Sequence, residues 1–197
     1  MAFTFSRRDF MKYTALAAAA VAVSGSLTGC ANPNQPSGKV GDTLSFGGSS
    51  TIFGIGGASD KHTLKTAVGS KDDNGKLVCT FEHYPVSDAT SCDNNHYQLR
   101  VVKEDGTVQY VNAGNKAVSF SGNNPSSSLK KEEKITNELT ISSLNAEGVL
   151  KDVTVKEAYI QYFPRHNALG TENDAYSDVY ATWDITDALK AALTTRT

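Results

Sequence analysis

The sequence YQLRVVKEDGTVQYV, at residues 97–111, predicts a β-hairpin. Apolar side chains such as Tyr97 and Leu99 alternate with polar ones, which is the period-two pattern of a half-buried strand. The pair Asp105-Gly106 lies between the two alternating runs and is typical of a two-residue turn that needs positive φ. The stretch therefore indicates antiparallel pairing of neighbouring strands.

The same alternation recurs along most of the chain. We predict further strands at 42–46, 62–68, 76–84, 116–120, 135–141, 153–163 and 179–185. Breaks rich in Gly, Ser, Asn and Pro separate them. Residues 186–194 look helical, because Leu189 and Leu193 lie one turn apart, and Asp184 or Thr186 can cap the first turn. The sequence thus predicts a mainly β chain, an antiparallel β-sandwich with a short C-terminal helix.

The N-terminal residues have the composition of a secretory signal. A basic cluster is followed by an apolar run at 13–23 and then by small residues that end at Cys30. The apolar run is shorter than the roughly 18 residues that a permanent membrane span needs. We therefore predict that residues 1–29 are a signal peptide.

Two short motifs within this segment resemble known export signals. Residues 6–12, SRRDFMK, resemble the twin-arginine signal, in which a receptor reads Arg7 and Arg8. Residues 27–30, LTGC, resemble a lipobox. The resemblance implies a bacterial lipoprotein precursor that is cut before Cys30 and carries a diacylglyceryl group on that thiol. Two acyl chains are enough for stable anchoring, so we expect the mature protein on the extracytoplasmic face of the cell membrane.

The mature chain divides into a tether and one domain. Residues 30–39 are predicted to be the lipidated cysteine and a flexible tether, because the stretch has no large apolar residue. Residues 40–197 are predicted to form the β-sandwich, which is an ordinary size for one domain. Three of the 19 Lys and Arg residues and one of the 21 Asp and Glu residues lie in 1–29, so the mature chain has a formal charge of −4. This charge argues against a nucleic-acid partner.

The layout of the mature part resembles the immunoglobulin-like sandwich domains of uncharacterised Gram-positive lipoproteins. The resemblance rests on the strand pattern over 40–185, on Gly41-Asp42-Thr43 after the tether, and on LKKEE at 129–133 before a late strand. It implies an immunoglobulin-like fold and no particular activity.

Cys79 and Cys92 remain once Cys30 is lipidated, in a compartment where disulfides persist. We predict a bridge between them, worth roughly 3 kcal/mol by chain entropy; two unpaired thiols are the alternative. The spacings Cys79-x3-His83 and Cys92-x3-His96 combine zinc-ligand types. Four residues of a strand span about 13 Å, however, so no metal site is predicted.

Other motifs point to turns and loops. Residues 72–75, DDNG, lack the alternating ligands of a calcium loop and predict a turn. Residues 54–57, GIGG, are too short for a dinucleotide fingerprint and predict a loop. The sequence has no Gly-x-Ser-x-Gly elbow, and no Ser-His-Asp arrangement follows from its spacing. We therefore predict no catalytic residue and no cofactor.

Aromatic residues gather near the C-terminus. They are Tyr159, Tyr162, Phe163, Tyr176, Tyr180 and Trp183. Alternation places Ala181 and Trp183 inward and leaves Tyr180 outside, beside Tyr162. Exposed tyrosines can stack on sugars or anchor a protein, although they can also cover the edge of a core. Arg165 lies in a polar loop, a common place for binding sites. We predict binding through Tyr162, Tyr180 and Arg165.

These features predict a non-enzymatic, lipid-anchored binding or accessory module, with a protein or carbohydrate ligand. One alternative is a cell-envelope enzyme or solute-binding component whose site is dispersed along the sequence. Another is a structural or signalling subunit of a membrane complex. The sequence predicts no oligomeric state.

Overall fold

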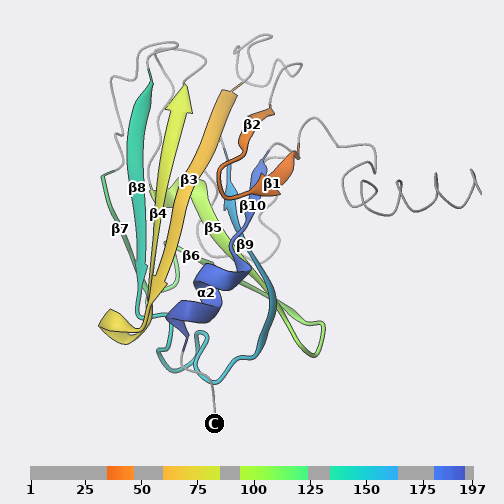
Figure 1. Cartoon of the computed structure of the whole chain (residues 1–197). Coiled ribbons are helices and arrows are strands. Elements are labelled where there is room, and N and C mark those ends of the chain that lie inside the picture. Colours follow the sequence, from red (N-terminus) through yellow and green to blue (C-terminus); the bar gives the residue numbers. More distant parts are fainter. Residues whose placement is uncertain (1–34, 47–59, 85–93, 124–133, 164–179, 194–197) are drawn as a thin grey trace, which may run out of the picture. The chain divides into compact units, whose positions relative to one another are not determined.

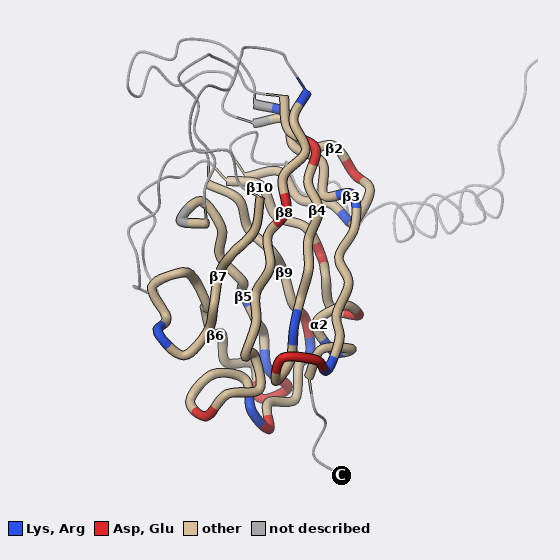
Figure 2. The backbone as a smooth tube through the Cα atoms, turned by 90° about the vertical axis from the view of Figure 1, so that its left-hand side faces the viewer, with Lys and Arg blue, Asp and Glu red and all other residues tan. Residues whose placement is uncertain are grey.

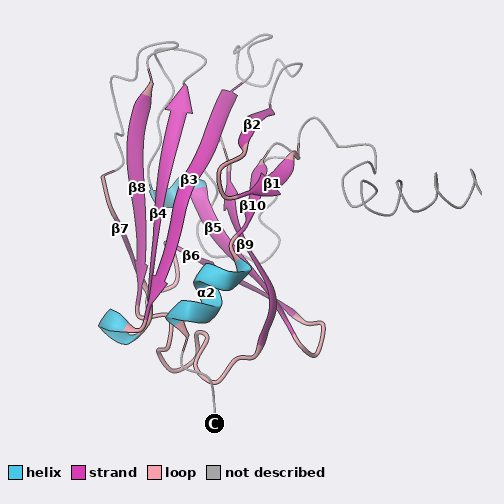
Figure 3. Ribbon diagram, in the orientation of Figure 1, coloured by secondary structure: helices cyan, strands magenta, loops and turns pink. Residues whose placement is uncertain are grey.

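The computed structural model describes residues 35–46, 60–84, 94–123, 134–163 and 180–193. All of them belong to the compact unit Pro33–Thr197 (Figures 1 and 3). The described elements are β1 (Ser37–Lys39), β2 (Thr43–Phe46), β3 (Asp60–Ser70), η2 (Asp72–Asn74), β4 (Lys76–Tyr84), η3 (Asn94–His96), β5 (Tyr97–Lys103), β6 (Val108–Asn112), β7 (Ser119–Ser121), β8 (Ile135–Ser142), β9 (Val155–Tyr162), β10 (Ala181–Asp184) and α2 (Thr186–Ala192).

The strands form two five-stranded sheets. Sheet A has the order β1-β10-β9-β5-β6, and sheet B has the order β2-β3-β4-β8-β7. The described pairings are antiparallel, except that β1 runs parallel to β10. The inward side chains of both sheets pack into a shared core. The predicted antiparallel β-sandwich with a C-terminal helix is confirmed, while the immunoglobulin-like resemblance stays a prediction.

Alternation along each strand builds the core. In β4, Leu77, Cys79 and Phe81 are fully buried, and the residues between them are half-buried on the other face. Trp183 of β10 is also fully buried, and its Nε1 donates a hydrogen bond to the backbone oxygen of Asp42 (3.0 Å). This bond ties sheet A to the segment that leads into sheet B. Burial of each such large side chain stabilises the fold by roughly 1.5–3 kcal/mol.

The predicted hairpin forms between β5 and β6, but its turn differs from the prediction. The backbone N–H of Lys103 donates to Thr107 O (2.9 Å), and Gly106 N–H donates to Lys103 O (2.9 Å), which leaves a loop of three residues. Gly106 has a positive φ of 83°, whereas Asp105 does not. The Asp105 carboxylate instead accepts hydrogen bonds from the backbone N–H (2.9 Å) and hydroxyl (2.6 Å) of Thr107. The turn therefore needs only one left-handed residue.

The helix α2 begins where the sequence predicts it and ends two residues earlier. The Asp184 carboxylate accepts hydrogen bonds from the backbone N–H (2.9 Å) and hydroxyl (2.6 Å) of Thr186 at its start. The Thr186 hydroxyl also accepts a hydrogen bond from the backbone N–H of Ala158 (2.9 Å). These contacts fix the start of α2 against β9.

The helix lies very close to β3, and Gly69 makes this approach possible. A Cβ atom at Gly69 would overlap the carbonyl oxygen of Ala188 and would lie 2.9 Å from the backbone N of Ala192. Leu189 and Leu193 fill the core on the buried side of the helix. Position 69 therefore requires glycine for space rather than for an unusual φ.

The structure also corrects the tether and the strand predicted at 116–120. The last three residues of the predicted tether form β1, because their backbone pairs with β10. The predicted strand at 116–120 is reduced to β7, since turns occupy the preceding residues: Val118 N–H donates to Asn115 O (3.2 Å).

The predicted turn at 72–75 is confirmed as η2, with positive φ at Asp73, Asn74 and Gly75. Figure 2 shows residues of opposite charge together at such turns, as in the pair of Lys76 with Asp73 (3.2 Å).

Candidate functional site

The outer face of sheet A carries two parallel rows of residues. Strand register places Thr182, Gln161, Gln98 and Asn112 side by side, and we call these the amide row. Register places Asp184, Tyr159, Arg100 and Tyr110 side by side in the next row, which we call the tyrosine row. Both rows face away from the core, because the residues that alternate with them along the strands, such as Leu99, Ile160 and Trp183, are fully buried.

The amide row is held in place by its own hydrogen bonds. Gln98 Nε2 donates to Gln161 Oε1 (3.2 Å), and Gln161 Nε2 donates to Thr182 Oγ1 (3.4 Å). Asn112 Oδ1 accepts a hydrogen bond from the backbone N–H of Gly114 (3.0 Å). Gln98 and Gln161 are each only 6% exposed. The row is therefore a rigid polar support for the side chains next to it.

The tyrosine row is more accessible, and its four members are half-buried. The Arg100 guanidinium carbon lies 5.5 Å from the centroid of the Tyr159 ring, a cation–π contact. The Tyr159 hydroxyl donates a hydrogen bond to Glu157 Oε2 (3.0 Å). Partial burial and then this hydrogen bond raise the pKa of Tyr159, so the hydroxyl stays protonated. The Tyr159 ring is thus held at its hydroxyl by Glu157 and over its face by Arg100.

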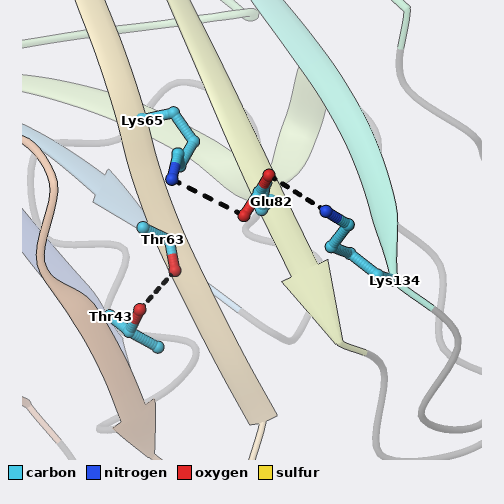
Figure 4. A network of polar contacts seen from close by, with 5 residues as sticks. All are labelled: Thr43, Thr63, Lys65, Glu82 and Lys134. Atoms are coloured by element: carbon cyan, nitrogen blue, oxygen red, sulfur yellow. Dashed lines mark hydrogen bonds and ion pairs between the residues drawn. The ribbon is translucent and has the colours of Figure 1, made fainter.

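Arg100 has no ion pair among the residues that the structure describes. Sheet B is different, because Glu82 on its outer face lies between Lys65 (3.8 Å) and Lys134 (3.3 Å), as Figure 4 shows. The acidic groups near Arg100 are engaged elsewhere: Glu157 accepts from Tyr159, and the Asp184 carboxylate accepts from Thr186. Within the described part of the chain, the guanidinium donors of Arg100 are therefore not taken up by an ion pair.

An open groove of about 610 Å³ adjoins one end of the tyrosine row. Its lining residues are Lys39, Val40, Ala67, Lys156, Glu157, Asp184, Ile185, Thr186, Asp187 and Ala188. Asp184 belongs to both the row and the groove, and Glu157 touches both through Tyr159. Row and groove therefore form a continuous surface with charges of both signs.

A second polar group lies inside the sandwich. His62 and His83 are paired across β3 and β4, face inward, and are fully buried with ring centroids 4.1 Å apart. The Tyr162 ring packs on His62 at an interplanar angle of 31°, with ring centroids 4.0 Å apart, and its centroid lies 6.1 Å from that of His96. Three of the four histidines thus meet near one end of the core, which sequence spacing did not predict. For His62 and His83, an inward position in the strands predicted at 62–68 and 76–84 was the available signal.

The environment of His62 keeps it uncharged. The Tyr97 hydroxyl accepts a hydrogen bond from Asn137 Nδ2 (2.8 Å) and lies 3.4 Å from His62 Nε2, to which it can donate. Nδ1 of His62 has no hydrogen-bond partner. Burial, and then the proximity of His83 and His96, hold the pKa of His62 well below its ordinary value. Within the described residues, no three His, Cys, Asp or Glu side chains could hold a metal ion.

The two predicted binding residues that the structure describes, Tyr162 and Tyr180, do not lie on one exposed surface. The prediction that Tyr162 lies exposed beside Tyr180 is wrong, because Tyr162 pairs with Ala181 and shares its inward face, fully buried. Tyr180 is half-buried and packs on Phe163, with ring centroids 5.2 Å apart. Arg165 lies outside the described residues, as do the predicted loop at 54–57, Arg7, Arg8 and Cys30.

Cys79 lies in the middle of β4 with no exposed surface and has no disulfide partner among the described residues. Burial raises its pKa to about 12. Cys92 lies outside the described residues, so the predicted bridge stays a prediction, and forming it requires Cys92 to enter the core.

We expect native protein to protect Cys79 from a maleimide at pH 8, because its thiol is both inaccessible and protonated. In urea, complete labelling without reductant is expected if the thiol is unpaired. Mass spectrometry of a Cys30→Ala protein measures the extent of labelling in the native and the unfolded state. In the control, which also carries Cys92→Ser, Cys79 is the single remaining cysteine. Rapid labelling of the native Cys92→Ser variant would contradict the burial of Cys79. Labelling that needs reduction would establish the bridge.

Comparison with known proteins bears on the N-terminus. A family model described as the TAT (twin-arginine translocation) pathway signal sequence matches residues 4–24, which include Arg7 and Arg8. No curated protein and no solved structure matches the chain. Within the described residues, none of the helices has the length and apolar character needed to cross a membrane. The chain thus carries a twin-arginine signal for export across the cytoplasmic membrane to an extracytoplasmic location.

Proposed function

We propose that this exported protein is a lipid-anchored, non-enzymatic binding module that presents the outer face of sheet A to its ligand. The observation that carries the proposal is the tyrosine row, in which Tyr110, Arg100 and Tyr159 lie half-buried on a rigid sheet. Aromatic and arginine side chains supply large contact area and directed donors at little cost in conformational entropy. The hydrogen-bonded amide row beside them supports such a preorganised surface.

The anchoring part of the proposal rests on the sequence around Cys30. Residues 27–30 place small residues before the cysteine, as a lipobox does, and the polar residues that follow can separate the domain from the membrane. The first described strand begins at Ser37, so at most six residues separate Cys30 from the folded part. Such a spacer reaches roughly 20 Å when fully extended.

The intact mass of protein extracted from native membranes tests the anchor. We expect the mass of a chain that starts at Cys30 and carries a diacylglyceryl group, and the protein should leave the membrane only with detergent. A Cys30→Ala variant should lack the lipid and appear in the soluble extracytoplasmic fraction. An unlipidated chain that still contains residues 1–29 would contradict both anchoring and processing.

Retention on isolated cell envelopes tests the binding face. A soluble Cys30→Ala chain should sediment with washed envelopes, and the added change Tyr159→Ala should reduce the bound fraction at least fivefold. Glu82→Gln on the outer face of sheet B is the matched control and should bind like the parent. Equal retention of all three chains, or no retention of any, would refute binding through sheet A.

A further inference from the structure

We infer that the ligand of this face is an uncharged oligosaccharide chain, which lies across the strands from Tyr110 to the groove beside Asp184. This inference rests on the proposed function and adds the chemical class of the ligand. It draws on the spacing of the two tyrosine rings, the balance of charges along the path and the size of the groove.

The two tyrosines are spaced for successive contacts with one chain. Tyr110 on β6 and Tyr159 on β9 lie on either side of Arg100 on β5. Two strand intervals separate them, about 10 Å. This distance is comparable to the length of two linked sugar rings, whose flat C–H faces pack on aromatic rings. Arg100, between the tyrosines, can donate to ring and hydroxyl oxygens.

The charges along the path favour a neutral ligand. Its basic groups are Arg100, Lys39 and Lys156. Its acidic groups are Glu157, Asp184 and Asp187. An anionic chain would meet three carboxylates and a cationic chain would meet three cations. Hydroxyl groups can accept from the basic side chains and donate to the acidic ones, and hydrogen bonds to charged groups are the stronger kind.

The shape and composition of the surface fit a chain better than a protein partner. The groove of about 610 Å³ has the size of a small-molecule site. Stable protein interfaces bury roughly 800 Å² on each partner around an apolar centre. Here the centre is Arg100 with two tyrosines. Aliphatic side chains lie in the next row, at Val102 and Val108, and in the groove, at Val40 and Ile185, rather than together at the centre.

The test is calorimetric titration of the soluble Cys30→Ala chain with three neutral hexaoses, cellohexaose, maltohexaose and chitohexaose, and with a galacturonate hexamer as the acidic probe. We expect at least one neutral hexaose to bind at least tenfold more tightly than the acidic one. Raising the salt from about 0.1 to 0.5 M should change its Kd less than twofold, since no net charge is neutralised. The matching disaccharide should bind at least tenfold more weakly, because it cannot span both rings and the groove.

Variants localise the binding. Tyr110→Ala and Tyr159→Ala should each weaken the binding of the hexaose at least tenfold. Tyr159→Phe keeps the ring but loses the hydrogen bond to Glu157, so it should weaken binding less than Tyr159→Ala does. Glu82→Gln, on the outer face of sheet B, is the control and should stay within threefold of the parent. Thermal unfolding of each variant identifies any that fails to fold, and Tyr159→Phe then still tests the site, because loss of binding in that folded variant contradicts stacking.

The outcomes separate this inference from the proposed function. Tighter, salt-sensitive binding of the galacturonate hexamer would overturn the neutral ligand. Failure of all four oligosaccharides to bind would overturn the carbohydrate class, and envelope retention that still depends on Tyr159 would leave the proposed function standing. If that retention is also independent of Tyr159, the proposed function fails with it.

Discussion

Gly69→Ala is expected to lower the free energy of unfolding by about 3 kcal/mol, at the upper end of the range for overpacked sites. The added methyl group would overlap the carbonyl oxygen of Ala188. A backbone atom cannot rotate aside as a flexible side chain can, so either β3 or α2 has to shift. Such a shift would expose Leu189 and Leu193, which are now buried. Urea unfolding measures the loss.

A second glycine supplies the matched control. Gly106 has a φ of 83°, and a Cβ atom there would meet nothing within 4 Å. Gly106→Ala should therefore cost only the conformational penalty, about 1–2 kcal/mol. Hydrogen exchange should show faster exchange of the Leu189 and Leu193 amides in Gly69→Ala alone. A Gly69→Ala protein as stable as Gly106→Ala, with slow exchange at both amides, would show that the helix does not depend on this close approach.

The second large effect is a loss of stability in mild acid, caused by His62. In the unfolded chain this histidine titrates near 6.5, whereas in the folded protein burial holds its pKa well below that value. Between the two values only the unfolded state binds the proton. The free energy of unfolding should therefore fall as the pH drops below about 6.5, by about 1.4 kcal/mol per pH unit, until the folded pKa is reached.

Urea titrations between about pH 7.5 and 5 measure this effect while Asp and Glu remain largely ionised, and variants of His62 separate it from the other three histidines. Trp183 is the single tryptophan, its ring lies 6.1 Å from that of His62, and its fluorescence reports the transition. His62→Phe keeps an aromatic ring and should flatten the pH dependence. His62→Gln keeps a polar group and should flatten it as well. An unchanged slope in both variants would assign the acid sensitivity to other groups.

The strands were largely predictable, because each buries one face and therefore has apolar and polar residues in alternation. The prediction at 76–84 coincides with β4, and the helix at 186–194 differs from α2 only at its end. β1 was missed because residues 37–39, SGK, show no such alternation. Their strand conformation comes from pairing with β10, which is a tertiary contact. Turn chemistry near Asn115 likewise shortened the strand predicted at 116–120.

The site was predictable in kind but not in position. Exposed tyrosines on a sheet were expected, yet Tyr162 faces the core and Tyr159 faces outward. Ala158, Ile160 and Tyr162 occupy every second position of β9 and are buried. Their alternation in the sequence already indicated that Tyr162 faces the core and Tyr159 the other side. The neighbours across the strands, Arg100 and Tyr110, could not be assigned to the row, because register between β5, β6 and β9 is fixed by pairing that local sequence does not encode.

The edge strands of the two sheets have a consequence for the lipid anchoring that we propose. The outermost strands are short: β1 and β7 have three residues each, β2 has four and β6 has five. Long free edges can add strands from neighbouring copies, and short ones offer few backbone groups for this. Molecules confined to a surface collide far more often than molecules in dilute solution. Such edges let many copies crowd together without their sheets fusing into larger aggregates.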